Sequence, residues 1–241
     1  MQSPPLHSIG RMSKWLVRCT VANIIINIIF TIASYSDVIV PGEDTYVSHN
    51  GQILIPAVSP FEINSFQLLE ILSFSVAAII GLYWFYRANK NIHAMGAKKI
   101  SSPRMAVIWY FVPILNLWKP YKVAQQIWKS SNPQIKLTNG NEWKNSRSSS
   151  SIKIWWTLWI STIFIKILSV VLLVYVFTLL LHGLSGDVSD IMALSFYDVF
   201  RFISSFVLDL AIITYILSGF FFILMIRRIS IWQEIKLGKS V

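Results

Sequence analysis

Residues 81–131 read GLYWFYRANKNIHAMGAKKISSPRMAVIWYFVPILNLWKPYKVAQQIWKSS, and this stretch decides how the whole chain is arranged. Its apolar centre, Met105 to Trp118, is shorter than the roughly 20 apolar residues that a helix needs to cross a bilayer. Pro113 interrupts this centre, and basic residues lie on both sides of it. We therefore expect a re-entrant or in-plane hairpin that enters the membrane and returns on the same side.

The overall composition is that of a multi-pass membrane protein. Of the 241 residues, 54% are hydrophobic and 14% are aromatic, and the mean hydropathy is +0.57. An ordinary soluble domain contains only about 45–50% apolar residues. The net charge of +10 would also suit a nucleic-acid-binding protein, but these cations flank apolar runs, which is the positive-inside pattern of membrane proteins. We expect the lipid bilayer as their partner, and no nucleic acid.

Apolar runs and loop charges together predict the topology. Four stretches are long enough to span the membrane, and they are residues 19–35, 65–86, 154–181 and 202–226. Residues 36–64 and 182–198 carry acidic side chains without Lys or Arg, so 36–64 and 182–201 are expected to be extracytoplasmic loops. The basic residues gather in 1–18, 87–153 and 227–241. This distribution predicts a multi-pass membrane protein with both termini in the cytoplasm.

Local signals refine the connecting segments. Ser102 and Pro103 are typical of a helix start, Pro113 predicts a break, and Pro120 begins a second, amphipathic helix that ends near residue 130. Residues 131–153 are rich in Ser, Asn and Lys and are expected to form a polar, mobile linker. In the first outer loop, Asn50-Gly51 between short apolar runs predicts a β-hairpin over residues 46–55.

Several of these segments resemble one known family. They are WFYRANKNIHAMGA (84–97), SPRMAVIWYFVPILNLWKPYKVAQQIW (102–128), WWTLWI (155–160) and IRRISIWQ (226–233). They are similar to a bacterial family of multi-pass membrane proteins catalogued as domain of unknown function 4328. The resemblance covers residues 82–159 best, and its most specific part is the FVPxxNLWxPY block at 111–121. That family has no established biochemical activity, so the resemblance implies only class and location, namely a multi-pass protein of the bacterial inner membrane.

The sequence contains none of the following common enzyme motifs. There is no paired-histidine helix, no phosphate-binding Gly-rich loop and no Gly-x-Ser-x-Gly elbow. The four histidines are scattered, and Cys19 is the only cysteine, which excludes an intrachain disulfide. We expect no metal, no cofactor and no enzyme activity. A hidden intramembrane hydrolase stays an alternative, because catalytic triads are recognised by geometry rather than by sequence order.

Three ionisable residues fall within the expected spans, namely Glu70, Lys166 and Asp209. A charge that faces lipid at a helix centre costs about 2.5 to 3.5 kcal/mol, so each is expected to face the bundle interior. They either line a pathway or neutralise one another, and Arg201 is a further candidate partner of Glu70. A polar stripe on the first span either hydrogen-bonds to neighbouring helices or lines a pathway, and we favour packing. It consists of Thr20, Asn23, Asn27 and Thr31.

A second candidate site lies on the basic side. Arg87 and Asn91 share a helix face beside Lys90, and Asn116 falls at the tip of the expected hairpin. Together they predict a site for an anionic headgroup, although Arg87 and Lys90 can equally serve as simple interfacial anchors.

The sequence therefore predicts an all-α integral membrane protein with four spans and a hairpin broken at Pro113 and Pro120. Its expected role is non-enzymatic interaction or scaffolding, with anionic lipid at the cytoplasmic face and a membrane-protein partner or a second copy of the chain. The alternative is a small transporter or channel subunit that uses Glu70, Lys166 and Asp209.

Overall fold

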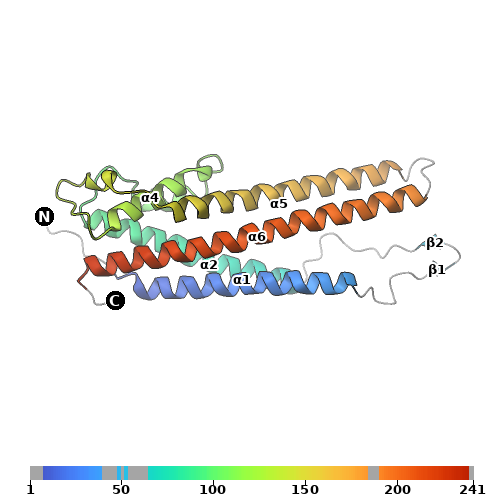
Figure 1. Cartoon of the computed structure of the whole chain (residues 1–241), viewed down its shortest axis with the longest axis horizontal. Coiled ribbons are helices and arrows are strands. Elements are labelled where there is room, and N and C mark those ends of the chain that lie inside the picture. Colours follow the sequence, from blue (N-terminus) through green and yellow to red (C-terminus); the bar gives the residue numbers. More distant parts are fainter. Residues whose placement is uncertain (1–7, 40–47, 50–51, 54–64, 184–189, 239–241) are drawn as a thin grey trace.

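Four long helices lie side by side in an elongated bundle (Figure 1). The computed structural model describes residues 8–39, 48–49, 52–53, 65–183 and 190–238. The long helices are α1 (Gly10–Ile39), α2 (Ser65–Ala94), α5 (Ser150–Gly183) and α6 (Asp190–Lys236). Shorter elements are α3 (Pro103–Ile108), η2 (Leu115–Leu117), α4 (Lys119–Ser131) and η3 (Glu142–Asn145), with strands β1 (Ser48–His49) and β2 (Gln52–Ile53).

Each long helix contains a segment that can cross a membrane by its length and composition. These segments are Gly10–Ala33, Gln67–Ala94, Ser150–Leu172 and Phe206–Lys236, with mean hydropathies between 1.8 and 2.3. The expected fold class is confirmed, and the chain is a multi-pass membrane protein. The helices nevertheless extend well past the expected spans, and most of the expected loop at 182–201 is the first part of α6. Hydropathy marks only the apolar part of a helix, whereas its backbone hydrogen bonds continue into polar sequence.

The segment from 95 to 149, which we call the cap, packs against one end of the bundle, at the left of Figure 1. There α3 packs on α2, and α4 contacts α2, α5 and α6. The fully buried apolar side chains gather at this capped end, among them Leu16, Trp84, Ile92, Ile127 and Ile229. Along the rest of the bundle the outward side chains are apolar and exposed, as is expected of helix faces that contact lipid.

A buried amide network joins three helices at the capped end. Gln233 of α6 accepts a hydrogen bond from the Asn91 side chain of α2 (2.8 Å) and donates to the Ser131 hydroxyl of α4 (2.9 Å). Its Nε2 atom also donates to the Ala88 carbonyl at 3.1 Å. Gln233 is completely buried, so this network fixes how the helices meet.

The start of α1 is held by the end of α6. Oε1 of Glu234 accepts hydrogen bonds from the backbone N–H groups of Ile9 and Gly10, both at 2.9 Å. The Ser8 hydroxyl donates to the same oxygen at 2.7 Å. A carboxylate at a helix N-terminus satisfies otherwise unpaired N–H groups and complements the positive end of the helix dipole.

Residues 131–153 do not form the expected mobile linker. The Trp143 side chain is buried, and its indole N–H donates to the Lys98 carbonyl at 3.0 Å. Gly140 has a φ of 85°, and a Cβ atom there would lie 2.5 Å from the Gly96 carbonyl oxygen. The Trp143 side chain thus fixes this segment to the rest of the cap, and composition alone does not distinguish a packed polar segment from a mobile one.

At the opposite end of the bundle, β1 and β2 pair antiparallel on either side of Asn50-Gly51 (Figure 1). Ser48 lies opposite Ile53, and His49 lies opposite Gln52. The turn itself lies outside the described residues.

Candidate functional site

The hairpin of the cap has the proline-broken form that its sequence indicates. Ser102 accepts a hydrogen bond from the Met105 N–H (3.4 Å), and α3 starts at Pro103. The helix ends at Ile108, and Pro113 lies in the turns that follow. Pro120 is buried in the first turn of α4.

The turns between α3 and α4 present apolar side chains to the surroundings. Phe111 is 69% exposed and Ile114 is 70% exposed. Ile108, Leu117 and Trp118 are exposed as well. Such a run of apolar residues beside basic ones is typical of a segment immersed in the membrane interface.

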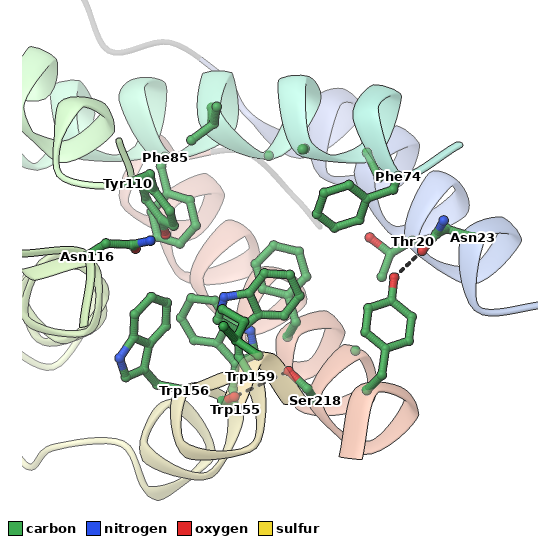
Figure 2. Close-up of a pocket in the computed structure, with 18 of the residues that line it drawn as sticks. Thr20, Asn23, Phe74, Phe85, Tyr110, Asn116, Trp155, Trp156, Trp159 and Ser218 are labelled. Atoms are coloured by element: carbon green, nitrogen blue, oxygen red, sulfur yellow. Dashed lines mark hydrogen bonds between the residues drawn. The ribbon is translucent and has the colours of Figure 1, made fainter. Parts of the chain in front are cut away.

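Behind this hairpin lies an aromatic cavity of about 340 Å³. Figure 2 shows it between α2 on one side and α5 and α6 on the other, with the hairpin at one end and α1 at the opposite end. Its lining contains no Asp, Glu, Lys or Arg. The cavity is thus a mostly apolar hollow, of the size at which small-molecule sites begin.

Aromatic rings bridge the two helices that flank the cavity. Phe74 of α2 stacks on Trp159 of α5 with ring centroids 6.1 Å apart, and Phe85 stacks on Trp155 at 6.2 Å. Phe222 of α6 also packs on Trp155, at 5.2 Å. The backbones of α2 and α5 are not among the closely packed helix pairs, which are α5 with α6, α1 with α2 and α1 with α6. The two helices therefore contact each other through these rings rather than through closely packed backbones.

The end of the cavity away from the cap is lined by polar groups with hydrogen-bond partners. The Tyr215 hydroxyl donates to Oδ1 of Asn23, and Nδ2 of Asn23 donates to the Ser73 hydroxyl at 2.7 Å. Thr20 donates to the Leu16 carbonyl of its own helix at 2.9 Å. Asn23 thus joins α1 to α2 and α6, in keeping with the packing interpretation of the polar stripe, while Thr20 and Asn23 also line the cavity.

The end of the cavity near the cap contains polar groups without partners. The Tyr110 hydroxyl and Oδ1 of Asn116 are buried and make no hydrogen bond. An unpaired buried group costs about 1–3 kcal/mol, so two of them at one place call for an explanation. Burial also raises the pKa of Tyr110 above its ordinary value, so the hydroxyl keeps its proton. The neighbouring wall is fixed by Trp156, whose indole N–H donates to the Leu117 carbonyl at 2.8 Å.

A second hollow, which we call the arginine groove, lies between α1 and α2 at the capped end. It measures about 520 Å³, and its lining includes Arg11, Trp15, Tyr83 and Arg87. Arg87 lies over the Tyr83 ring at 5.8 Å, and its Nε atom is buried without a hydrogen-bond partner. Two guanidinium groups beside aromatic rings give this groove the chemistry of an anion site at a membrane surface.

The structure does not bring the predicted headgroup residues into one site. Arg87 lines the arginine groove, whereas Asn116 lines the aromatic cavity. Asn91 is buried in the amide network with Gln233, and Lys90 lines neither hollow. The prediction grouped these residues by their spacing in the sequence. Spacing does not show that Arg11, from another helix, is the second cation of the arginine groove.

The residues of the predicted intramembrane charge group differ in how far they are buried. Glu70 and Asp209 are partly buried, but the Lys166 side chain is exposed, so the prediction that it faces the interior is wrong. Lys166 lies seven residues, or about two turns, after Trp159 and therefore on a similar face of α5. Arg201 lies in α6, and its side chain is outside the described residues.

Sequence reasoning missed both hollows. A signal for the aromatic cavity exists on α2, where Ala77, Ala78 and Gly81 lie between Phe74 and Phe85 on the side facing α5. Small residues between aromatic ones leave room beside a helix. The arginine groove gave no such signal, because it depends on which helices are neighbours. Among the described residues, no three His, Cys, Asp or Glu side chains gather as metal ligands would.

Comparison with known proteins gives one match. The sequence model of the family described as "Domain of unknown function (DUF4328)" matches residues 63–230, which is more than half of the chain. No curated protein and no solved structure matches. The chain belongs to the DUF4328 family, and the match spans α2 to α6 and therefore includes the cap and most of the cavity lining.

Proposed function

We propose that this DUF4328 member is a non-enzymatic interaction or scaffolding component of the bacterial inner membrane, whose capped end faces the cytoplasm and binds anionic lipid in the arginine groove. The observation that carries the proposal is the pairing of Arg11 and Arg87 beside Trp15 and Tyr83. Basic pockets between membrane helices on the cytoplasmic side recognise phosphate-bearing headgroups. Aromatic rings of this kind favour the headgroup level of a membrane.

The orientation rests on the distribution of charge. The cap contains Lys98, Lys99, Arg104 and further cations, and α6 ends at the same place with Arg227 and Arg228. A bound lipid would tie α1 to α2 and keep the cap at the membrane surface. The folded cap would then offer the contact surface for a membrane-protein partner or a second copy of the chain.

The aromatic cavity favours this role over a transporter that uses Glu70, Lys166 and Asp209. None of these three residues lines the cavity. A transport pathway for ions would need the charges and the hollow at the same place.

Lipid binding is tested by thermal unfolding of the purified protein in nanodiscs with and without phosphatidylglycerol. We expect anionic lipid to raise the melting temperature of the wild type, and each arginine in the groove to contribute about 1 kcal/mol at low salt. The double variant Arg11→Gln/Arg87→Gln should lose most of this gain. Arg147→Gln is the matched control, because Arg147 is an exposed cation of the cap outside the groove. Equal stabilisation of both variants would contradict the proposal.

Orientation is tested separately by labelling single cysteines in cells, in a Cys19→Ala background. Ser148→Cys, which is exposed in the cap, should react only after permeabilisation. Ser185→Cys, in the connection between α5 and α6, should react from outside. The reverse pattern would place the cap outside the cell.

A further inference from the structure

We infer that the aromatic cavity binds a single-chain amphiphile with an uncharged, hydroxyl-bearing head, drawn from the membrane leaflet on the capped side. The cavity shares no lining residue with the arginine groove. The inference is therefore independent of anionic lipid binding, and either can fail without the other.

The cavity is open to the lipid and spans one leaflet. Phe74 and Phe111 both line it and are exposed, so its mouth lies on the outer surface of the bundle. Between Phe74 and Phe85, α2 rises about 16 Å, which is close to half the roughly 30 Å thickness of the hydrocarbon core. A hollow at this depth that opens sideways is filled from the bilayer, whose chains have the matching length.

The two ends of the cavity differ in the hydrogen-bonding groups that they offer to an occupant. At the end away from the cap, the Tyr215 hydroxyl is already bonded to Asn23. At the cap end, the Tyr110 hydroxyl and Oδ1 of Asn116 are buried without partners, and Figure 2 shows both residues at this end of the cavity. An amphiphile would place its head at the cap end, which is also the end nearer the membrane surface.

The chemistry of these two groups selects the head. Oδ1 of Asn116 can only accept a hydrogen bond, whereas the Tyr110 hydroxyl can donate one. A hydroxyl is donor and acceptor at once and satisfies both. A phosphate or carboxylate would offer Asn116 no proton and would meet no cation, because the lining contains none. The volume of about 340 Å³ suits one chain better than two.

The test uses the full-length protein in nanodiscs and a photoactivatable analogue of hexadecanol. Labelled peptides are mapped by mass spectrometry, and labelling is challenged with hexadecanol, hexadecyl methyl ether or hexadecyl phosphate. The ether accepts a hydrogen bond but cannot donate one. We expect labels on α2, α5 or the hairpin at the cavity, with hexadecanol competing about three- to tenfold better than the ether and the phosphate competing least.

Two kinds of variant assign the site. Ala78→Phe fills the cavity and should abolish saturable labelling, whereas Ala22→Phe adds the same ring to an exposed position of α1 and should not. Tyr110→Phe and Asn116→Leu should remove the preference for hexadecanol over the ether. Tyr121→Phe, on α4 outside the cavity, should keep it.

Three results would overturn the inference. They are labels that map outside the cavity in the wild type, undiminished labelling of Ala78→Phe, and equal or better competition by hexadecyl phosphate. The positions of the labelled peptides and the order of the competitors are measured on the wild type. These two results therefore test the inference even where a variant fails to fold.

Discussion

At its capped end the bundle closes around a packed core, whereas one or two turns further along, α2 and α5 leave a hollow between them. The capped end contains the fully buried side chains Trp84, Ile127 and Ile229 and the amide network of Gln233. In the hollow the same helices meet through rings such as Phe74 and Trp159. The side chains that stabilise the fold are thus concentrated at the capped end. The section of the bundle at membrane level has room for a binding site.

The largest effect is expected at Trp84. Its side chain is completely buried, and its indole N–H donates to the Ser230 hydroxyl at 3.2 Å. Trp84→Ala should lower the free energy of unfolding by about 3–5 kcal/mol, because it leaves a large cavity in the core. Ile167→Ala is the counterpart, since Ile167 is 54% exposed on α5 and faces lipid. Thermal unfolding in detergent should show little change for Ile167→Ala. Similar losses of stability at both positions would contradict the difference between the capped end and the lipid-facing surface.

The next effect concerns the amide network. Gln233→Met keeps the length of the side chain but removes the hydrogen bonds that Gln233 makes with Asn91 and Ser131. We expect a loss of about 1–3 kcal/mol, the usual penalty for a buried polar group left unsatisfied. Gln134→Met, at an exposed position of the cap, should be nearly neutral in the same thermal assay. A neutral Gln233→Met would mean that packing alone aligns α2, α4 and α6.

A smaller effect separates two glycines of similar conformation. Gly140 and Gly238 both have positive φ, 85° and 69°, so alanine is strained at either position. Only at Gly140 would the added Cβ also meet a backbone oxygen, that of Gly96. Gly140→Ala should therefore destabilise the protein by about 1–2 kcal/mol more than Gly238→Ala. Proteolysis of the cap is a second readout, and equal sensitivity of the two variants would show that the turn is not held tightly.

The smallest effect is a pH dependence in the cap. The Asn139 backbone N–H donates to Oε1 of Glu142 at 2.6 Å, and this bond lowers the pKa of the Glu142 carboxyl. A carboxyl with a lowered folded-state pKa stabilises the protein above its unfolded pKa, and this stability is lost as the pH falls through the folded value. The melting temperatures of the wild type and Glu142→Gln should therefore converge between about pH 6 and pH 3. A constant difference in melting temperature over that range would show that the charge of the Glu142 carboxylate does not contribute to stability.

Much of the fold is readable from the sequence because hydropathy acts locally. The four spans and the break at Pro113 follow from apolar run length and from the chemistry of proline. The packing of residues 131–149 does not follow, since it depends on one buried ring, Trp143, and on backbone partners far along the chain. The exposure of Lys166 could not be foreseen either, because it depends on how the helices are arranged in space. Asn116 was a candidate residue from the sequence, but only the fold shows that it and Tyr110 are both unsatisfied at the same cavity.

The hydrogen bonds between Glu234 and the start of α1 have a consequence for how the protein is made. Glu234 lies 224 residues after Gly10, so the ribosome adds almost the whole intervening chain before the carboxylate exists. At about 5–20 residues per second, that delay is on the order of 10–45 seconds. During this time the first N–H groups of α1 do not yet have the Glu234 carboxylate as their acceptor. Among the described helices, α1 is therefore made before α6, and its start gains the Glu234 acceptor only once α6 has been made.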